Sequence, residues 1–410
     1  MSLRIFDAAV IGGGAAGMMA AIAAGRRGKN IIVLEHEDFC GKKLRITGKG
    51  RCNVCNDCDV KTFLQNVPVN PKFLYAALSR FSPADTIAFF ESLGVPLKTE
   101  RGNRVFPVSD NAHDVARALE RAMRASGVRI RKEEATEILT ADGAVCGVKC
   151  SDGVIECASA LVATGGVSYP RTGSTGDGHR MARALGLAVT PLRPSLVPLT
   201  SDDPDCAKMQ GFSLKNVTLT LCDREGRRLY TELGEMMFTH FGVTGPLVLS
   251  ASAHMHDEAA RPFTIEIDLK PGLDEKKLDA RILRDFEKYR NRDFSNALCD
   301  LAGRTMIPVL VRRSGIPPET KVHTITREQR MKLVELFKHF TVAISGTRPV
   351  DEAIVTSGGV AVGEINPRTM ESKRVRGLFF AGEVIDVDAY TGGFNLQIAW
   401  STGKLAGENL

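Results

Sequence analysis

The chain has 410 residues, of which 43% are hydrophobic and 25% are charged. Because a single hydrophobic core rarely grows beyond about 250–300 residues, we expect at least two lobes. The composition is that of an ordinary globular protein, which excludes a largely disordered chain. Met1–Phe6 lead directly into an apolar stretch rather than into a secretory signal, so we expect a cytoplasmic protein whose ten cysteines are reduced.

The formal net charge is +6, and the chain contains no run of five or six like charges. Aromatic residues are scarce, and Trp400 is the single tryptophan. Since proteins that bind single-stranded nucleic acid combine basic grooves with stacked aromatic rings, this composition argues against a nucleic-acid partner. The longest uncharged window, 236–256, contains Gly242, Gly245 and Pro246, so we expect no membrane span. We therefore expect a small-molecule substrate, and the sequence leaves the oligomeric state open.

The amino-terminal part predicts a strand, a tight turn, a helix and a second strand. Ile5–Ile11 is apolar, three glycines follow it, Ala15–Arg27 is rich in alanine and methionine, and 30–34 is again apolar and β-branched. Such a βαβ unit places its two strands parallel to each other.

The spacing of apolar residues predicts further elements along the chain. In the first lobe these are a helix over 110–126, strands at 128–131, 145–150 and 158–166, and a helix over 176–185. Beyond Pro191 they are strands that include 217–221 and 263–267, a helical region over 274–340, a strand over 377–382 and a closing helix over 393–409.

We therefore expect an α/β protein with three parts. Residues 1–190 and 345–410 form a Rossmann-like dinucleotide-binding domain, 191–272 with part of 305–344 form a β-rich inserted domain, and 273–340 form a helical segment.

Gly12, Gly14 and Gly17 form a G-x-G-x-x-G pattern between the first strand and the first helix, and Glu35 ends the second strand. This is the fingerprint of a dinucleotide site, because the glycines permit a tight turn and close approach of a diphosphate to the helix amides. Ala15 and Ala16 begin that helix. Glu35 can accept hydrogen bonds from the ribose hydroxyls. The pattern alone does not separate NAD from FAD.

Three later segments favour FAD. Leu161–Gly166 resembles a strand followed by the ATG segment of many flavoproteins, and Leu378–Glu383 resembles their carboxy-terminal strand, which brings an acid toward the ribityl chain. Thr391–Asn395 opens the last helix, where amides can stabilise negative charge on a reduced flavin.

Longer motifs point to one family. They are Gly41–Lys43, Ile46–Asn53, Thr172–Gly178, Gly234–His240 and Ala381–Trp400. In these segments the chain resembles the BaiN-like (YhiN-type) flavoproteins over essentially its full length. The resemblance implies non-covalent FAD on a Rossmann-like lobe, with an inserted β-barrel-like lobe and a small helical lobe. It also implies two directions of chemistry, which are reduction of carbon–carbon double bonds in oxidised bile acids and oxidation of small amines such as aminoacetone.

The loop from Gly41 to Asn53 is strongly basic. Its cations could wrap the diphosphate or approach the flavin, where reduction builds negative charge, although a solvated loop is the alternative. The predicted cofactor-binding residues are Gly12, Gly14, Ala15, Ala16, Gly17, Glu35, Lys42, Lys43, Arg51, Cys52, Asn53, Ala135, Thr164, Gly165, Gly382, Glu383, Gly393, Phe394, Asn395 and Leu396.

Cys52, Cys55 and Cys58 fall at every third residue, a spacing that superficially resembles iron–sulfur ligation. A cluster needs four thiolates, and Thr62 stands where the bacterial spacing would put the next one. We expect reduced thiols and no metal.

His240, Lys49 and Tyr169 are the candidate catalytic residues. A histidine such as His240 could supply a proton to the carbon opposite hydride delivery, although a structural role is the alternative. Tyr169 lies in a motif expected to face the flavin, as does Tyr390, and the sequence does not rank these groups.

The function expected from the sequence is FAD-dependent reduction of a carbon–carbon double bond in an enone or steroid-like substrate, with NAD(P)H as a transient electron donor. The chain has one dinucleotide fingerprint, so NAD(P)H would visit the same flavin as the substrate. The alternatives are an amine oxidase that uses oxygen, and a flavin-containing tRNA-handling or docking module without turnover.

Overall fold

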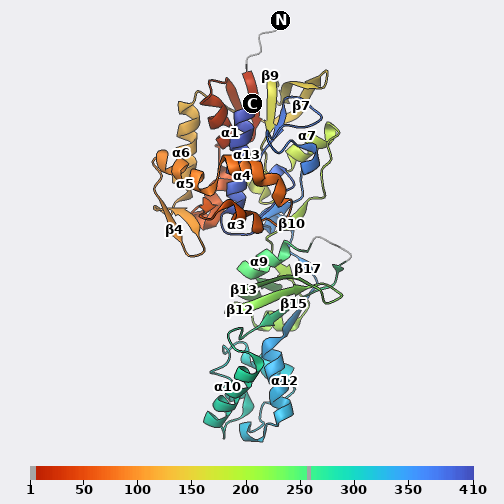
Figure 1. Cartoon of the computed structure of the whole chain (residues 1–410). Coiled ribbons are helices and arrows are strands. Elements are labelled where there is room, and N and C mark those ends of the chain that lie inside the picture. Colours follow the sequence, from red (N-terminus) through yellow and green to blue (C-terminus); the bar gives the residue numbers. More distant parts are fainter. Residues whose placement is uncertain (1–5, 256–259) are drawn as a thin grey trace. The chain divides into compact units, whose positions relative to one another are not determined.

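The structure is a computed structural model that describes residues 6–255 and 260–410 (Figure 1). The chain divides into two compact units, of which unit 1 comprises Met1–Ser195 and Val350–Leu410 and unit 2 comprises Leu196–Pro349. Ile5 of the first predicted strand and His256 of the uncharged window lie outside the described residues. Among those described, no helix is both long and apolar enough to cross a lipid bilayer.

Unit 1 is built on a mixed sheet whose parallel part has the order β6-β2-β1-β9-β19. Its strands are β1 (Phe6–Ile11), β2 (Ile31–Glu35), β6 (Arg129–Lys132), β9 (Gly153–Val162) and β19 (Leu378–Phe380). Two further strands, β7 (Ala135–Ala141) and β8 (Ala144–Cys150), extend the sheet from β9 in antiparallel fashion. The burial of β1 and β2 is nearly continuous, as expected of parallel strands covered on both faces.

Helix α1 (Ala15–Gly25) packs closely against the last helix, α13 (Phe394–Asn409). Small residues make this possible. A Cβ on Gly403 would lie 2.4 Å from the carbonyl oxygen of Ala16, and one on Gly407 would lie 2.3 Å from that of Ala20. The two helices therefore meet backbone to backbone, which ties the end of the chain to the dinucleotide turn at its start.

Between β2 and helix α6 (Ala112–Ala125) the chain forms many short elements. They are α2 (Lys42–Ile46), η1 (Thr47–Gly50), β3 (Cys55–Asn56), α3 (Val60–Gln65), η2 (Pro71–Leu74), α4 (Tyr75–Arg80), α5 (Pro83–Ser92), β4 (Leu97–Glu100) and β5 (Arg104–Pro107). Helix α5 begins with a reciprocal capping box between Ser82 and Asp85. The indole of Trp400 donates a hydrogen bond to the carbonyl of Val54 (2.9 Å), which anchors this region to α13.

The remaining elements of unit 1 follow β9 or the return of the chain from unit 2 in the sequence. They are η3 (Pro170–Thr172), α7 (Asp177–Ala184), β10 (Arg193–Ser195), η7 (Val350–Glu352), β18 (Val355–Ser357), η8 (Val362–Glu364) and η9 (Gly382–Val384). Strands β10 and β18 pair antiparallel, so the outgoing and returning chains form one small ladder.

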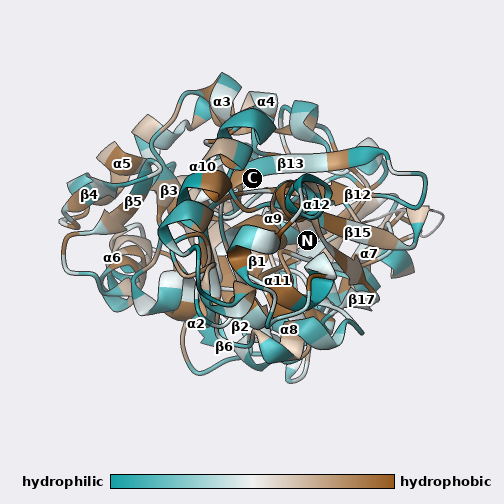
Figure 2. Ribbon diagram, turned by 90° about the horizontal axis from the view of Figure 1, so that it is seen from below, coloured by the Kyte–Doolittle hydropathy of each residue, from teal (hydrophilic) through white to brown (hydrophobic). Residues whose placement is uncertain are grey.

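Unit 2 contains an antiparallel sheet of order β16-β15-β12-β13-β14-β11-β17. Its strands are β11 (Leu199–Thr200), β12 (Ser213–Cys222), β13 (Arg228–Thr239), β14 (Gly242–Thr244), β15 (Phe263–Asp268), β16 (Phe340–Ile344) and β17 (Gly346–Thr347). Its helical elements are α8 (Pro204–Lys208), α9 (Pro246–Ser252), α10 (Glu275–Lys288), η5 (Phe294–Asn296), α11 (Ile307–Ser314), η6 (Val322–Thr324) and α12 (Arg327–Lys338). In Figure 2, β12 and β15 carry long brown stretches, whereas α10 and α12 show the teal of their exposed faces.

The structure confirms the predicted strands and helices and moves several of their ends. The strand predicted over 158–166 runs from Gly153 to Val162. The region predicted as helical over 274–340 ends before Phe340, because Phe340 belongs to β16 and pairs with Ile267. The segment Gly41–Asn53, predicted as a loop, begins with the short helix α2, whereas Gly48 and Lys49 within η1 are left-handed rather than helical. The helix was hard to predict because the segment is rich in glycine and α2 starts directly after Gly41, which is in the left-handed conformation.

Candidate functional site

The carboxyl ends of the central parallel strands meet at one edge of the unit 1 sheet. Ile11 at the end of β1 pairs with Leu34 of β2 on one side and with Val162 of β9 on the other. Val162 in turn pairs with Phe380 at the end of β19. The segments that follow these strands therefore emerge side by side, which is where open α/β sheets bind their ligands.

The glycine turn after β1 is fixed by steric limits. Gly12 has a φ of +100°, and a Cβ there would lie 2.7 Å from the carbonyl oxygen of Ala163. A Cβ on Gly17 would lie 2.0 Å from the carbonyl oxygen of Gly12, so α1 could not approach the turn. Gly14 differs, because the nearest atom to its Cβ position is 3.9 Å away. The turn thus leaves open space at Gly14, beside the start of α1.

No side chain caps α1, and its first turn contains no acidic residue. Its first residues, Ala15 and Ala16, carry backbone N–H groups that a helix start leaves without intrahelical acceptors. A helix start of this kind, next to an open glycine, suits a diphosphate.

Glu35 is held at the turn by two backbone amides. The N–H of Gly13 donates to one carboxylate oxygen and the N–H of Glu37 donates to the other, each at 2.9 Å. The Glu35 side chain is 12% exposed. Since a carboxylate can accept about four hydrogen bonds, both oxygens keep capacity for ribose hydroxyls. Ala135 is buried at the start of β7, the strand that follows β6.

Lys43 and Glu383, predicted separately as cofactor residues, contact each other. The Lys43 Nζ donates to Glu383 Oε2 at 3.0 Å, to the hydroxyl of Ser168 at 2.8 Å and to its carbonyl at 3.2 Å. The other carboxylate oxygen accepts from the Thr356 amide (2.8 Å) and the Ser168 hydroxyl (3.0 Å). Burial alone would raise the pKa of Glu383, but Lys43 and these hydrogen bonds outweigh it and hold that pKa below its ordinary value.

The turns around this pair are closely packed. Gly165 has a φ of +74°, and its Cβ position lies 3.9 Å from Glu383 Oε2. Gly382, with a φ of +76°, lies against Ala16 of α1, where a Cβ would come within 2.9 Å. Thr164 has a buried hydroxyl without a hydrogen-bond partner among the described residues. The ends of β1, β9 and β19 thus form one packed group.

Most cations of the basic segment are neutralised within the protein. Lys42 pairs with Glu37 at 2.7 Å. The Arg51 guanidinium binds Glu100 and Asp110 and lies 4.1 Å from the centre of the Phe106 ring. Because of these carboxylates the pKa of Arg51 is raised.

Lys49 is the exception. It is exposed and has no ion pair with any residue that the structure describes. Its φ is +59°, and the neighbouring Gly48, Gly50 and Cys52 are also left-handed. A non-glycine residue in this region costs on the order of 1–3 kcal/mol, so the segment holds Lys49 in an unusual conformation.

The basic segment reaches the start of α13 through Asn53. A Cβ on Gly393 would lie 2.9 Å from Asn53 Oδ1 and 2.4 Å from the backbone of Cys55. Asn53 Oδ1 is buried and has no hydrogen-bond partner among the described residues. A buried acceptor left without a donor is rare in native proteins, so this oxygen is suited to a donor supplied by a ligand.

Asn395 and Phe394 support the turn before α13 from within. The Asn395 side chain accepts from the amide of Ala389 (2.9 Å) and donates to its carbonyl (2.7 Å). Phe394 is buried edge-on against Phe63, with ring centres 5.2 Å apart, and Leu396 packs against the core. These side chains fix the shape of the turn before α13.

The three regularly spaced thiols are packing residues. Cys52 and Cys55 are buried and Cys58 is half-buried. Burial raises the pKa of Cys52 to about 12 and that of Cys58 to about 11, so both stay protonated at neutral pH. Within the described ranges, no group of three or more metal-binding side chains forms a cluster.

The three candidate catalytic residues lie in different settings. Tyr169 is 38% exposed, has a φ of +51° and follows Ser168, the buried partner of Lys43 and Glu383. Lys49 projects from the left-handed segment described above. His240 belongs to unit 2, where it is exposed in the turn between β13 and β14 and contacts the Phe241 ring edge-on.

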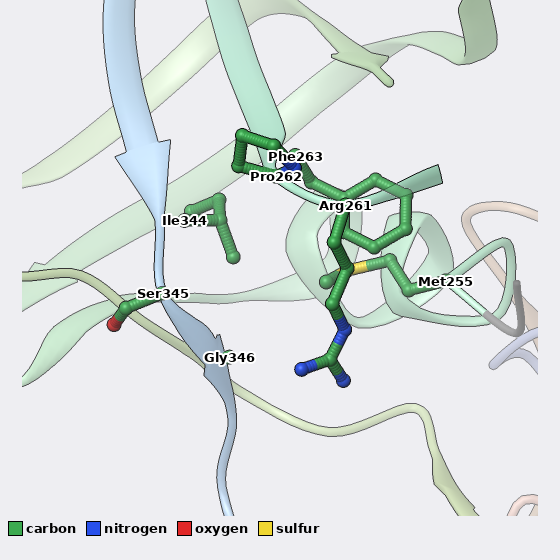
Figure 3. A pocket seen from close by; sticks show the side chains of 7 residues that line it. All are labelled: Met255, Arg261, Pro262, Phe263, Ile344, Ser345 and Gly346. Carbon is green, nitrogen blue, oxygen red and sulfur yellow. The ribbon is translucent and has the colours of Figure 1, made fainter. Parts of the chain in front are cut away.

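Sequence reasoning missed Ser168 and Thr356. Neither belongs to a recognisable motif, and both reach Glu383 only through the tertiary fold. Unit 2 also has a pocket that sequence reasoning did not predict, lined by Met255, Arg261, Pro262, Phe263, Ile344, Ser345 and Gly346 (Figure 3). It contains none of the predicted site residues.

Comparison with known proteins gives a match over almost the whole chain. The family described as HI0933-like protein Rossmann domain matches residues 6–409. The 3-dehydro-bile acid delta(4,6)-reductase of Clostridium scindens is 31% identical over 403 residues, which is 97% of each chain. The ribosomal RNA dihydrouridine synthases of Escherichia coli and Haemophilus influenzae are 29% and 30% identical, and cover 99% and 96% of this chain and 98% and 95% of their own.

Solved structures share the fold at low sequence identity. The 3-ketosteroid-delta4-(5alpha)-dehydrogenase of Rhodococcus jostii has a TM-score of 0.54 at 16% identity, with 98% of this chain and 96% of that chain covered. An open flavocytochrome c3 fumarate reductase has a TM-score of 0.52 at 17% identity, with 98% and 78% covered.

Proposed function

This chain belongs to the HI0933-like Rossmann family of flavin-dependent oxidoreductases, and we propose that it uses FAD to reduce a carbon–carbon double bond conjugated to a carbonyl group. The observation that carries the proposal is the meeting of the ends of β1, β2, β9 and β19 at one sheet edge. There the glycine turn, Glu35 and the Lys43–Glu383 pair are brought together.

The residues at this edge fit FAD. The open position at Gly14 and the uncapped start of α1 suit the diphosphate, and Glu35 suits the adenosine ribose. Near the start of α13, the unpartnered acceptor of Asn53 and the backbone after Gly393 suit the polar edge of the flavin. When bound, FAD would supply the two-electron hydride chemistry.

The named relatives point to one bond type. A reductase of 3-dehydro-bile acid delta(4,6) double bonds and an enzyme that makes dihydrouridine both add two hydrogens to a double bond next to a carbonyl. In such a reduction the carbon farther from the carbonyl takes a hydride and the nearer carbon takes a proton. With NAD(P)H as the proposed donor, NAD(P)H and one proton are consumed and NAD(P)+ is released.

This chain's own residues have separate roles in the proposal. The Lys43–Ser168–Glu383 group orients the turns after β9 and β19, and the proposed role of Lys49 is to bring positive charge to the cofactor. Tyr169, Lys49 and His240 are the candidates for the proton donor. A conjugated carbonyl is activated by hydrogen-bond donors, since charge develops on its oxygen during hydride addition.

Two substrate classes follow from the relatives. The first is a steroid-like or other small enone, as in the Clostridium scindens enzyme. The second is a uracil base in RNA, which two further relatives of similar identity favour.

The test is anaerobic mixing of the FAD-loaded protein with NADH or NADPH, followed by a 3-oxo-4-ene steroid. Bleaching of the flavin by the nucleotide and recovery of its colour on adding the steroid are expected. Bleaching by aminoacetone alone, with recovery only in oxygen, would identify an amine oxidase instead.

A further inference from the structure

The net positive charge of the chain is concentrated in the helical segment 273–340. This segment contains 15 Lys and Arg against 10 Asp and Glu, a net charge of +5 out of +6 for the whole chain. The chain contains no long run of like charges, yet the excess positive charge lies in one part of unit 2. Helices α10 and α12 of this part appear at one end of unit 2 in Figure 1.

Five cations of the segment have no carboxylate within ion-pair distance in the described part of the chain. They are Lys276, Arg284, Arg292, Arg304 and Arg327, all exposed. The other ten form ion pairs, including Arg330 with Asp279 and Lys338 with Asp268. The excess charge is therefore carried by side chains that are free to bind an anionic partner.

Backbone contacts bring η6 beside the end of α10 and the residues that follow it. On α10, Arg284 precedes Lys288 by one helical turn, so both lie on the same face. The amide and Nδ1 of His323 approach the carbonyl of Arg290 at 3.3 and 2.9 Å. The amide of Val322 donates to the carbonyl of Arg292 at 3.1 Å.

We name this surface the basic tip. It consists of Arg284, Lys288, Arg290, Arg292, Lys321, His323 and Arg327. Of these, Lys288, Arg290 and Lys321 also form ion pairs, with Asp300, Glu287 and Asp293.

The basic tip also presents an aromatic ring. Lys288 Nζ lies 4.9 Å and the Arg292 guanidinium 4.8 Å from the centre of the half-buried Tyr289 ring. The Tyr289 hydroxyl is held by Asp300 at 2.8 Å. Cations beside a fixed aromatic ring are a combination that binds phosphates and bases of RNA.

We propose that the basic tip is a docking surface for RNA. This inference rests on the proposed function in one respect, since it favours a uracil base within RNA over a free small molecule as the natural substrate. The charge supports a polyanion, the aromatic ring favours nucleic acid over an acidic protein, and two relatives are named for ribosomal RNA.

The experiment compares two charge-reversal variants of the FAD-loaded protein. The tip variant carries Arg284→Glu, Arg292→Glu and Arg327→Glu. The control variant reverses three exposed cations of unit 1 that also lack ion pairs among the described residues, by Lys61→Glu, Lys72→Glu and Arg121→Glu. Both have the same net charge. Thermal unfolding and flavin content establish that each is folded and loaded.

Binding of a uridine-rich stem-loop RNA is measured over a range of salt concentrations. The wild-type protein is expected to bind with a strong salt dependence. The tip variant is expected to lose at least about tenfold in affinity, and its log–log salt slope should fall by about 2–3, since each lost phosphate contact removes roughly 0.7–0.9 from the slope. The control variant should lose less than half of this effect.

Reduction of a small enone by the same three proteins separates this inference from the proposed function. Unchanged enone reduction with loss of RNA binding in the tip variant supports the docking surface. Equal RNA binding by tip variant and wild type, equal losses in both variants, or binding of anionic vesicles but not RNA by the wild type would each overturn it. Failure of all three proteins to reduce either the enone or uridine in the RNA would count against the proposed function alone.

Discussion

At the scale of single residues, Gly14 and Gly17 belong to the same motif but face different constraints. A Cβ on Gly17 would strike the Gly12 carbonyl at 2.0 Å, whereas one on Gly14 has no atom closer than 3.9 Å. Gly14→Ala should therefore leave the fold intact and weaken FAD binding by tenfold or more, because its methyl group would occupy the space that we propose for the diphosphate. Gly17→Ala should destabilise the protein itself. Thermal unfolding of the flavin-free protein and FAD titration measure the two effects, and normal FAD affinity in Gly14→Ala would contradict the assignment.

The Lys43–Glu383 pair makes a second prediction at this scale. The two side chains are 25% and 21% exposed, so solvent weakens their attraction. Lys43→Met should lower the free energy of unfolding by about 1–3 kcal/mol, since it leaves a mostly buried carboxylate without its cation. The double variant Lys43→Met/Glu383→Gln should recover part of that loss in urea unfolding. If the loss in free energy of unfolding in the double variant equals or exceeds the sum of the losses in the two single variants, attraction between Lys43 and Glu383 does not explain the destabilisation.

These residues also mark how far sequence reasoning reaches. Gly12, Gly17 and Glu35 could be predicted as cofactor residues because the roles expected of them depend on neighbours close in the sequence and on one known turn. Ser168 and Thr356 were missed because their hydrogen bonds to Glu383 depend on the fold of distant segments. Arg51 was predicted for the cofactor, but its partners Glu100 and Asp110 could not be foreseen.

At the scale of elements, the ladder of β10 and β18 is held by one buried carboxyl group. Asp388 is 1% exposed and accepts hydrogen bonds from Ser195 on β10 (2.8 Å) and Ser357 on β18 (3.0 Å). Burial raises its pKa to about 6, against the hydrogen bonds of the two serines, and Asp386 and Glu383 add to the rise. The two strands that lead to and from unit 2 thus share a carboxyl group that titrates near neutral pH.

The sign of the pH effect follows from this raised pKa. The folded protein holds the Asp388 proton more tightly than the unfolded chain does. The contribution of protonated Asp388 to the free energy of unfolding is therefore full below about pH 4 and is lost as the pH rises through about 6. The loss is at most about 3 kcal/mol for a shift of this size. Asp388→Asn cannot ionise, so its stability relative to the wild type should rise between pH 4 and pH 7. Chemical unfolding at several pH values tests this, and a constant difference would show that Asp388 does not titrate.

The long elements were predictable and the short ones were not. Strands β1 and β2 and helices α1, α6 and α13 have strong apolar patterns over their length. The region of residues 54–107 consists of helices and strands of two to ten residues, which are too short for a period to emerge. Its elements are stabilised by local caps such as Ser82 and by long-range hydrogen bonds such as that of the Trp400 indole. The long-range hydrogen bonds can be seen only once the fold is known.

At the scale of the whole molecule, the chain combines a general redox scaffold with an inserted unit. Unit 1 carries the residues that fit FAD, and unit 2 carries the basic tip. The family and its α/β fold could be identified from motifs along the sequence. The choice among substrates could not, because enzymes with the same cofactor scaffold differ in the surfaces around it.

The most direct test of the account is the fate of hydrogen in a single turnover. The FAD-loaded protein is given NAD(P)H carrying deuterium at the transferable position, together with a 3-oxo-4-ene steroid in ordinary water, without oxygen. We expect a saturated ketone with deuterium on the carbon farther from the carbonyl and a solvent proton on the nearer carbon. No reduced product from either the steroid or a uridine-containing RNA, beside a flavin that is reoxidised only when oxygen is admitted, would contradict the proposed function.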